Sequence, residues 1–327
     1  MSLDEGAPLD GTNRLPGLPE SAGNGSHPPT DDNLKAGCAD LKAGCARLFR
    51  RREEKYDVGL ASAAFLREEI ARRLPLFEYN PGHAFTHVTT IYFDTRDRHF
   101  FNEAVRNHNH SLRIRVKEYY YAVDSSERRE YLTSPFCFVE LKETIDRAVV
   151  KRRFAFPKAD LIRLFRREEV WPILLRISPP HEAGPMHDIY CEFRKFISSY
   201  PVEATSIVHY RRVVYQKMED DLRITFDDQL AVYPPVSDLY EHAKALTPDV
   251  LGKPVRKTDR VILEIKCAGE HPEWLRRALQ YHSSKRLSKF TTSIRFLLDE
   301  QSGREAALRS PPVPGEDDTT LSTEFLR

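Results

Sequence analysis

The feature that most constrains the fold of this chain is a stretch in which apolar and basic residues alternate, "SLRIRVKEY" at residues 111–119. Side chains of a β-strand point alternately to its two faces, so this stretch is typical of a strand with one apolar face. The opposite face carries three basic residues: Arg113, Arg115 and Lys117. Such a face commonly turns to water, but it can also line a site that binds negative charge.

Similar alternation recurs along the middle of the chain. The other strand-like runs lie at residues 87–95, 136–144, 149–156, 207–216, 222–230 and 260–267. Several of them place Lys or Arg at neighbouring positions of one face, with single carboxylates among them, whereas a solvated face mixes charges with Ser, Thr and Gln more freely. One such strand is best explained by a solvated outer face. The recurrence of the pattern favours a shared cationic surface.

Helical patterns complete the predicted architecture. Apolar residues have helical spacing at residues 61–74, 158–170 and 271–284. The apolar faces of the strands need a cover, which these helices can provide. The last strands are joined by short polar connections or one loop, which suits antiparallel pairing. We therefore expect an α+β fold in which an antiparallel β-sheet closes into a barrel, with a cationic interior and with the helices packed outside.

The two ends of the chain differ in composition from its middle. Residues 1–33 are rich in Gly, Pro, Ser, Asn and Asp, and residues 301–327 are similar. A tandem repeat, "LKAGCAD" followed by "LKAGCAR", occupies residues 34–47, where its glycines weaken a helix, and we interpret it as part of a linker. We expect one folded domain, residues 48–300, between a disordered N-terminal tail, residues 1–47, and a disordered C-terminal tail, residues 301–327.

Composition narrows the class of protein. The formal net charge is +1, so no overall basic field points to nucleic-acid binding. The sequence has no apolar run of the ~18 residues that a membrane span needs, and no secretory signal layout. Its five cysteines are odd in number and lack a C-x-x-C pair, which favours a reducing, cytoplasmic compartment and argues against a zinc site.

A series of short motifs carries a resemblance to a known family. In chain order they are "EEKY", "YFDT", "LRIR", "FVELKE", "YRRVVY", "LRITFDD", "LEIKC" and "RLSKF". Together they resemble the VTC domain, the polyphosphate-polymerase domain of vacuolar transporter chaperone proteins and their bacterial relatives, over about residues 50–298. That family belongs to the triphosphate tunnel, or CYTH-like, superfamily. The resemblance implies an antiparallel β-tunnel that binds a triphosphate chain, with a divalent cation at its mouth.

The resemblance also implies roles for individual residues. The basic residues implied to contact phosphate during catalysis are Lys55, Arg113, Arg115, Lys142, Arg212, Arg223 and Lys289. Further residues implied to bind the substrate are Arg106, Lys266, Arg286 and Ser288. Of these, Arg106 is the nearest candidate for an arginine that the family has between "YFDT" and "LRIR". The implied metal ligand is Glu264, with Glu140 or Glu53 beside it, and the expected ion is Mn²⁺ or else Mg²⁺, because such cations prefer oxygen ligands.

The family reaction moves the terminal phosphoryl group of ATP onto a polyphosphate chain. The resemblance therefore implies ATP and polyphosphate as partners. Because the sequence has no membrane segment, we expect a soluble enzyme or one that relies on a separate membrane partner. Phosphoryl transfer depends on positioning and charge neutralisation, and an ionised phosphate acceptor needs no general base. If water is the acceptor, a carboxylate such as Glu53 or Asp227 could orient it. Two alternatives stay open: an inorganic or nucleoside triphosphatase on the same tunnel, and a non-catalytic polyphosphate-binding module.

Overall fold

The structure is a computed structural model that describes residues 52–309, except residues 108, 125–128, 147, 218–220 and 237–244. The predicted N-terminal tail and its repeat lie outside the described residues, as do residues 310–327 of the predicted C-terminal tail. The last helix, α9 (Lys289–Arg309), continues past residue 300, where we expected the folded domain to end. No helix in the described part is long and apolar enough to cross a membrane.

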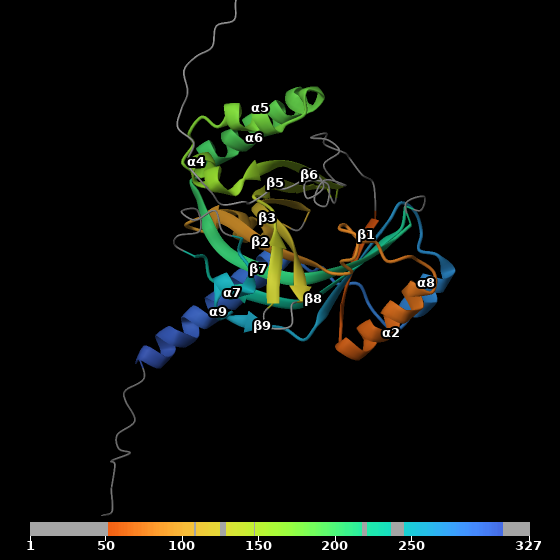
Figure 1. Cartoon of the computed structure of the whole chain (residues 1–327). Helices are drawn as coiled ribbons and strands as arrows, with labels where there is room; N and C mark the ends of the chain where they lie inside the picture. The colour runs from red at the N-terminus through yellow and green to blue at the C-terminus, as the bar shows by residue number, and fades with distance from the viewer. Residues whose placement is uncertain are drawn as a thin grey trace, which may run out of the picture.

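One antiparallel sheet forms the centre of the fold (Figure 1). Its ten strands are β1 (Arg52–Val58), β2 (Thr86–Thr95), β3 (His110–Asp124), β4 (Arg129–Thr133), β5 (Phe136–Ile145), β6 (Ala148–Pro157), β7 (Val202–Gln216), β8 (Arg223–Tyr233), β9 (Arg256–Lys257) and β10 (Val261–Cys267). They follow the order β1-β10-β8-β7-β2-β3-β5-β6, with β4 beside β3 and β9 beside β8. Every neighbouring pair is antiparallel. The predicted α+β class and antiparallel pairing are confirmed.

The sheet is strongly curved, but its closure into the predicted barrel is not shown (Figure 1). The hydrogen-bonded path ends at β1 and β6, and no pairing joins these two strands in the described ranges. Curvature nevertheless brings β1 close to β5, the neighbour of β6, because Nζ of Lys142 on β5 lies 3.9 Å from Oε1 of Glu53 on β1. A loop segment occupies the outer edge of β1, where the Lys285 N–H donates a hydrogen bond to the Lys55 carbonyl at 2.7 Å.

The helices agree with the sequence pattern in part. They are α2 (Leu60–Ala71), α3 (His99–Arg106), α4 (Leu161–Phe165), α5 (Trp171–Ile177), α6 (Ala183–Ser199), α7 (Pro248–Leu251), α8 (Glu273–Leu279) and α9. The first and third predicted helices are confirmed as α2 and the shorter α8. The stretch 158–170, predicted as one helix, is a 3₁₀ turn followed by α4. It stops near Arg167, whose φ of 65° is left-handed and cannot continue a right-handed helix.

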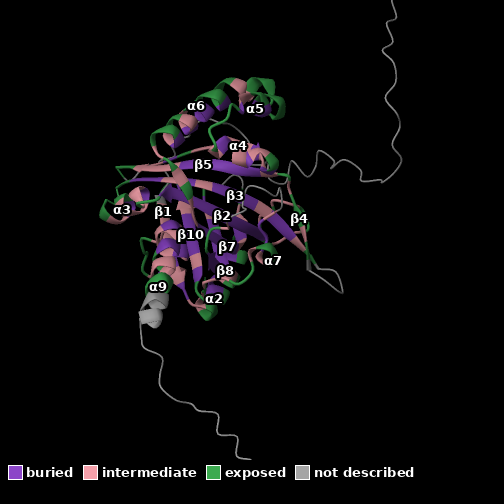
Figure 2. Cartoon of the chain, turned by 90° about the vertical axis from the view of Figure 1, so that its left-hand side faces the viewer, coloured by how far each residue is buried: buried purple, intermediate pink, exposed green. Residues whose placement is uncertain are grey.

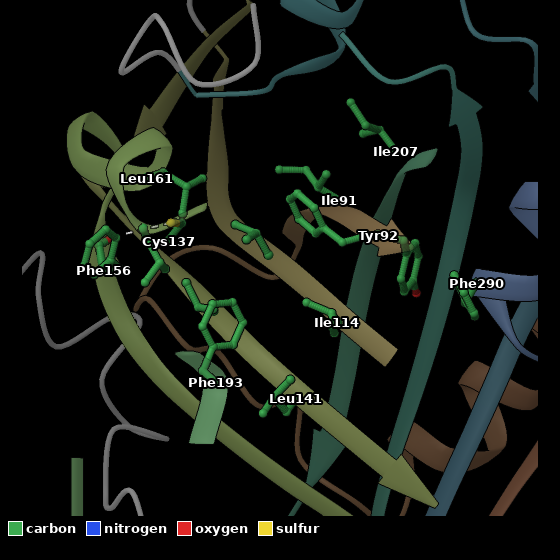
Figure 3. Close-up of a cluster of buried hydrophobic side chains, with 14 of the residues drawn as sticks. Ile91, Tyr92, Ile114, Cys137, Leu141, Phe156, Leu161, Phe193, Ile207 and Phe290 are labelled. Carbon is green, nitrogen blue, oxygen red and sulfur yellow. Dashed lines mark hydrogen bonds between the residues drawn. The ribbon is translucent and has the colours of Figure 1, made fainter. Parts of the chain in front are cut away.

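Helices cover one face of the sheet in two places. Helices α4 and α6 pack over β5 and its neighbours, where the cluster in Figure 3 includes Ile91, Ile114, Leu141, Phe156 and Phe193. Helices α2 and α8 pack over β1, β8 and β10, and the core there includes Leu66, Ile70, Ile224, Leu263 and Leu275. Figure 2 shows the exposed outer surfaces of α5 and α6 and the buried strands beneath. Full burial of such a side chain contributes about 1.5–3 kcal/mol, so these two cores hold the apolar face as predicted.

Helix α9 differs from the prediction that the helices pack outside. Its first turns lie against the opposite face of the sheet, where the Lys289 ammonium lies 2.5 Å from Asp227 Oδ2. One turn later the hydroxyls of Ser293 and Ser206 lie 2.8 Å apart. Residues four apart share one side of a helix, so Lys289 and Ser293 give α9 a polar side that matches a polar face of the sheet.

Candidate active site

The face of the sheet opposite α2, α4, α6 and α8 carries charged side chains, and we call it the charged face. Directly opposite residues of an antiparallel pair share a face, so the strand register defines it. Its basic residues are Lys55, Arg113, Arg115, Lys117, Lys142, Lys151, Arg153, Arg212, Arg223 and Lys266, joined by Lys289 from α9. Its carboxylates are Glu53, Glu140, Asp227 and Glu264. Positive charge is therefore in excess on this face.

The two ends of the curved sheet meet at a group that we call the Glu53 cluster: Glu53, Lys55, Lys142, Glu264 and Lys266. The Glu53 carboxylate lies 2.7 Å from the Lys55 ammonium, 3.8 Å from that of Lys266 and 3.9 Å from that of Lys142. The Glu264 carboxylate lies 2.8 Å from the Lys266 ammonium. Pairing of β1 with β10 brings the other members together, and Lys142 reaches them from β5.

The charges of the Glu53 cluster control its protonation. Burial and the neighbouring Glu264 raise the pKa of Glu53, but the ammonium groups around it lower this pKa to about 2. Burial also raises the pKa of Glu264, but Lys266 and Lys55 hold it well below its usual range. Burial lowers the pKa of Lys142 to about 7, although Glu53 opposes this shift. Both carboxylates are therefore ionised at neutral pH, whereas Lys142 is only about half protonated.

Glu140 lies in a second group, together with arginines of β3 and β6. Its carboxylate is 1% exposed and lies 2.6 Å from Arg115 Nε and 3.7 Å from Arg153 Nη1. Burial raises the pKa of Glu140, but Arg115 and the other cations nearby hold it well below its usual range. The sequence suggested Glu140 as a possible neighbour of Glu264. The structure pairs Glu140 with guanidinium groups instead, and four strands of the path separate β5 from β10.

A third group joins the sheet to α9. The fully buried Asp227 accepts two hydrogen bonds from Arg212, at 2.6 and 2.8 Å, and lies 2.5 Å from the Lys289 ammonium. Burial raises the pKa of Asp227, but Arg212 and Lys289 lower it to about 2. The charged groups of Arg212 and Lys289 lie 5.3 and 4.6 Å from the centre of the Tyr210 ring. Asp227 therefore fixes two cations of the site in place.

Two further arginines of the charged face keep donors available. Arg223, at the start of β8, donates a hydrogen bond to the Tyr79 hydroxyl, and its guanidinium lies 5.5 Å from the centre of that ring. Arg113 donates through Nη2 to Ser111 Oγ at 3.3 Å, while its Nε is buried without a hydrogen-bond partner. Because a guanidinium has five N–H donors, both side chains can bind an anion without releasing these contacts.

Three of the assigned residues lie away from these groups. Arg106 is exposed in the last turn of α3, and Arg286 is exposed in the loop before α9. Neither forms a hydrogen bond or ion pair with a described residue. Ser288 immediately precedes α9, and its Oγ accepts a hydrogen bond from the Thr291 N–H at 3.4 Å, as an N-cap does. In "RLSKF", the serine therefore fixes the start of the helix that presents Lys289.

The aspartate of "YFDT" also has a structural role. Asp94 is fully buried, and its carboxylate accepts hydrogen bonds from the backbone N–H groups of Thr95, Phe100 and Phe101 at 2.8, 2.9 and 2.9 Å. The last two belong to the first turn of α3, whose N–H groups have no partner within the helix. Asp94 therefore holds the connection from β2 to α3 and takes no part in the charged face.

Sequence reasoning assigned no role to several residues of the charged face. Lys117 follows the arginines of "LRIR" on the same face, and Lys151 and Arg153 lie opposite residues of β5 that belong to the site. Arg152 points to the other face, where it pairs with two glutamates at 2.8 and 2.9 Å. The two-residue period of the strands was enough to assign Lys117, Lys151 and Arg153 to the charged face and to exclude Arg152 from it.

A divalent cation fits this site only together with its substrate. Among the described residues, no group of three or more acidic, histidine or cysteine side chains could hold a metal ion by itself. Glu264 lies near enough to Glu53 for its charge to raise the pKa of Glu53. Mg²⁺ and similar ions are usually bound by one or two carboxylates, with phosphate and water oxygens as the other ligands. This pair of carboxylates is therefore the donor set that suits such an ion when phosphates are bound.

Comparisons with known proteins identify the family. Residues 50–298 match the VTC domain, and no curated protein matches the chain. Among solved structures, the PH1819 protein from Pyrococcus horikoshii is similar, with 12% identity, a TM-score of 0.34 and coverage of 76% of this chain and 99% of that one. The PH1012 protein from the same organism has 12% identity, a TM-score of 0.30 and coverage of 70% and 90%. The match of the VTC domain spans most of the chain, so the chain belongs to the VTC domain family.

Proposed function

We propose that this chain is a polyphosphate polymerase, which transfers the terminal phosphoryl group of ATP onto a polyphosphate chain held along the charged face. The observation that carries the proposal is the convergence of cations from opposite ends of the curved sheet, Lys55 from β1 and Lys142 from β5, on the same carboxylate. A place surrounded by cations in this way suits a ligand with several negative charges. Membership of the VTC domain family supports a phosphate chain as that ligand.

The basic residues act by placing phosphates and by neutralising their charge. Arg113, Arg212 and Arg223 present planar guanidinium groups that match phosphate oxygens, and Lys55 and Lys142 add compact charges. Bound phosphate also restores the proton of Lys142, because a nearby negative charge raises the pKa of an ammonium group. Charges fixed in a site shielded from water stabilise the charge that moves between phosphates as the phosphoryl group is transferred.

The carboxylates of the charged face are consistent with a phosphate acceptor. A general base works best when its pKa is near the working pH. The pKa of Glu53 and that of Asp227 are about 2, and those of Glu140 and Glu264 are well below their usual range. None of these carboxylates on the charged face is therefore poised to take a proton from water. The end of a polyphosphate chain is already ionised and needs no base, which is consistent with polymerisation at this site.

We propose Glu264, with Glu53, as the carboxylates that hold a divalent cation, Mn²⁺ or Mg²⁺. When bound, such an ion supplies charge to the phosphate oxygens and helps to orient them. Lys266, which lies 2.8 Å from Glu264 and 3.8 Å from Glu53, then turns its ammonium to phosphate. Glu140 is not included, because Arg115 and its neighbours occupy its oxygens.

We propose that the protein acts in the cytoplasm. The cysteines of the described residues, Cys137, Cys191 and Cys267, are all free thiols, which is consistent with the reducing cytoplasm that we expected. ATP is available there as the phosphoryl donor.

Product analysis tests the proposed function. The purified protein is incubated with ATP and Mn²⁺, and polyphosphate and free phosphate are measured separately. Long-chain polyphosphate is the expected product. Free phosphate without polymer would instead identify a triphosphatase on the same site, and the absence of both products, with binding retained, would identify a binding module. The Arg212→Met variant is the control for activity that comes from a contaminant, because it removes a guanidinium fixed inside the site.

A further inference from the structure

Lys117 is a buried lysine whose ammonium has no direct partner among the described residues. It lies on β3 and is 7% exposed, and by strand register its side chain is on the charged face. No hydrogen bond or ion pair joins it to any other described residue, and its ammonium lies 5.9 Å from the centre of the Tyr119 ring. An unpaired ammonium in such a place is costly. Burial and the positive charge of Arg115 lower the pKa of Lys117 well below its usual range, although the more distant charge of Glu140 opposes this shift.

A second polar group without a partner lies next to it. Thr90, on β2, stands directly opposite Lys117 in the register and is 1% exposed, and its Oγ1 is buried without a hydrogen-bond partner. Its neighbour Thr89, on the other face, differs, because its hydroxyl donates to the Leu246 carbonyl at 2.7 Å. A buried hydroxyl without a partner destabilises the folded protein. Two such groups side by side indicate a ligand that satisfies both.

The position of the pair shows which ligand would reach it. Lys117 and Arg113 lie on one face of β3, separated by about 13 Å at about 3.3 Å per residue. Arg113 lies at the end of this row that faces Glu53, whose charge acts on it, whereas Lys117 lies among Arg115, Arg212 and Lys151. A linear triphosphate has only two bridging oxygens between its phosphorus atoms and is shorter than this row. A longer chain extends from one end of the row to the other.

We propose that Lys117 and Thr90 form an inner phosphate subsite, which binds the phosphate that follows the first three in a linear chain of four or more. The ammonium and the hydroxyl each donate a hydrogen bond to its non-bridging oxygens. This subsite rests on the proposed function only in that the charged face binds phosphate chains. It makes the site selective for chain length, because a triphosphate fills the outer part of the row and leaves Lys117 and Thr90 without a partner.

Binding of inorganic phosphate chains tests the subsite without any turnover. Calorimetric titration compares inorganic triphosphate with linear tetraphosphate, in the wild type and in Lys117→Met, Thr90→Val and Arg152→Met. The wild type is expected to bind tetraphosphate about tenfold more tightly than triphosphate, a difference of about 1.4 kcal/mol. Lys117→Met removes this preference and changes triphosphate affinity by less than about twofold. Thr90→Val acts in the same direction with a smaller effect, and Arg152→Met, on the outer face, keeps the preference.

Other results would contradict the subsite, the polymerase or both. Equal loss of both ligands in Lys117→Met would place Lys117 in the triphosphate site itself, and unchanged tetraphosphate affinity would remove it from the phosphate path. Tight binding of both chains with no polymer formed would overturn the polymerase and leave the subsite standing, whereas a wild type that binds neither chain would overturn both proposals. The unfolding midpoint of the ligand-free protein monitors folding, and it is expected to stay level or rise in Lys117→Met because an unpaired charge is removed. If that variant unfolds early, the nearly isosteric Thr90→Val decides.

Discussion

Replacing Asp227 with asparagine tests whether the charged face is an anion site held together by its own carboxylates. Asp227 is fully buried, with two hydrogen bonds from Arg212 and the Lys289 ammonium at 2.5 Å. The substitution keeps the shape of the side chain but leaves two buried cations without a counter-charge. Breaking a buried ion pair in this way costs about 3–5 kcal/mol. Because the asparagine oxygen still accepts one hydrogen bond, we expect about 3 kcal/mol.

The adjacent aspartate provides a matched control. Asp228 lies on the opposite face and is also bound by two cations, Arg211 at 2.8 and 3.0 Å and Arg67 at 2.7 Å. The side chains of both arginines are 26% exposed, so water can solvate them when the carboxylate is lost. We therefore expect Asp228→Asn to cost about 1–2 kcal/mol, between the values for an exposed pair and for a buried one.

Urea denaturation at neutral pH, with and without inorganic triphosphate, measures both effects. In Asp227→Asn, bound triphosphate supplies the missing negative charge, so the ligand raises the free energy of unfolding more than it does in the wild type. In Asp228→Asn, triphosphate raises the free energy of unfolding only as much as it does in the wild type. Thermal scans should agree, since about 3 kcal/mol corresponds to a fall in Tm of roughly 6–12 °C for a domain of this size. Equal destabilisation by the two variants, or the same gain from triphosphate in both, would refute the assignment of the two faces.

Three further predictions use other residues. Glu264→Gln should lower metal-dependent turnover by at least about tenfold, the smallest cost of losing even an outer-shell partner of a metal ligand, while the protein stays folded, and full activity would assign the metal to another carboxylate. Arg223→Ala should weaken triphosphate binding by about 1.5–3 kcal/mol in calorimetry, and Arg152→Ala by less than about 1 kcal/mol, so equal losses would count against the charged face. Burial, with a smaller effect of His87, lowers the pKa of His209 to about 3. The unfolded chain therefore binds an extra proton between pH 6.5 and about 3, and stability falls as the pH drops below 6.5. By pH 5 the loss reaches about 2 kcal/mol, and His209→Gln should lose less in urea denaturation at pH 7 and pH 5.

The alternation of apolar and charged residues predicted most of the strands, because the same physical constraint acts on each of them. The strands β2, β3, β5, β6, β7, β8 and β10 lie close to their predicted ranges. Each strand has one face packed against helices or loops and the other face on the inner side of the curved sheet. Apolar and polar residues therefore alternate along its sequence. The pattern does not state whether the sheet closes, since closure depends on the tilt and stagger of the strands.

The elements that the sequence did not predict lack that period. β1 has consecutive charged residues over Arg52–Lys55, and it is a strand because it pairs along its whole length with β10. Helix α6 begins with "AGP", in which Gly184 and Pro185 resemble a turn. A proline in the first turn costs a helix little, because its missing N–H would have no partner there. In both cases tertiary contacts decide the local structure.

The two-residue period of the strands predicted which cations share a face, but it could not predict which carboxylate pairs with which cation. That pairing depends on the order of strands in the sheet. Glu53 was one of two possible neighbours of Glu264, and β1 lies directly beside β10, whereas Glu140 on β5 lies several strands away in the path. The contact between Lys142 and Glu53 across the curve joins residues of the two ends of the path, which no periodicity within one strand can indicate.

The charged face carries carboxylates, although negative charge opposes the binding of phosphate. The contacts of these carboxylates explain their presence. Glu140 and Asp227 are nearly inaccessible; Glu140 takes one donor from Arg115, and Asp227 takes three, from Arg212 and Lys289. A guanidinium has five donors and an ammonium has three, so each cation keeps donors for a ligand. We infer that these carboxylates hold the cations in fixed positions before phosphate arrives, which lowers the entropy lost on binding. Lys117 and Thr90 have no such support, and this is why the inner subsite depends on its ligand for all its hydrogen bonds.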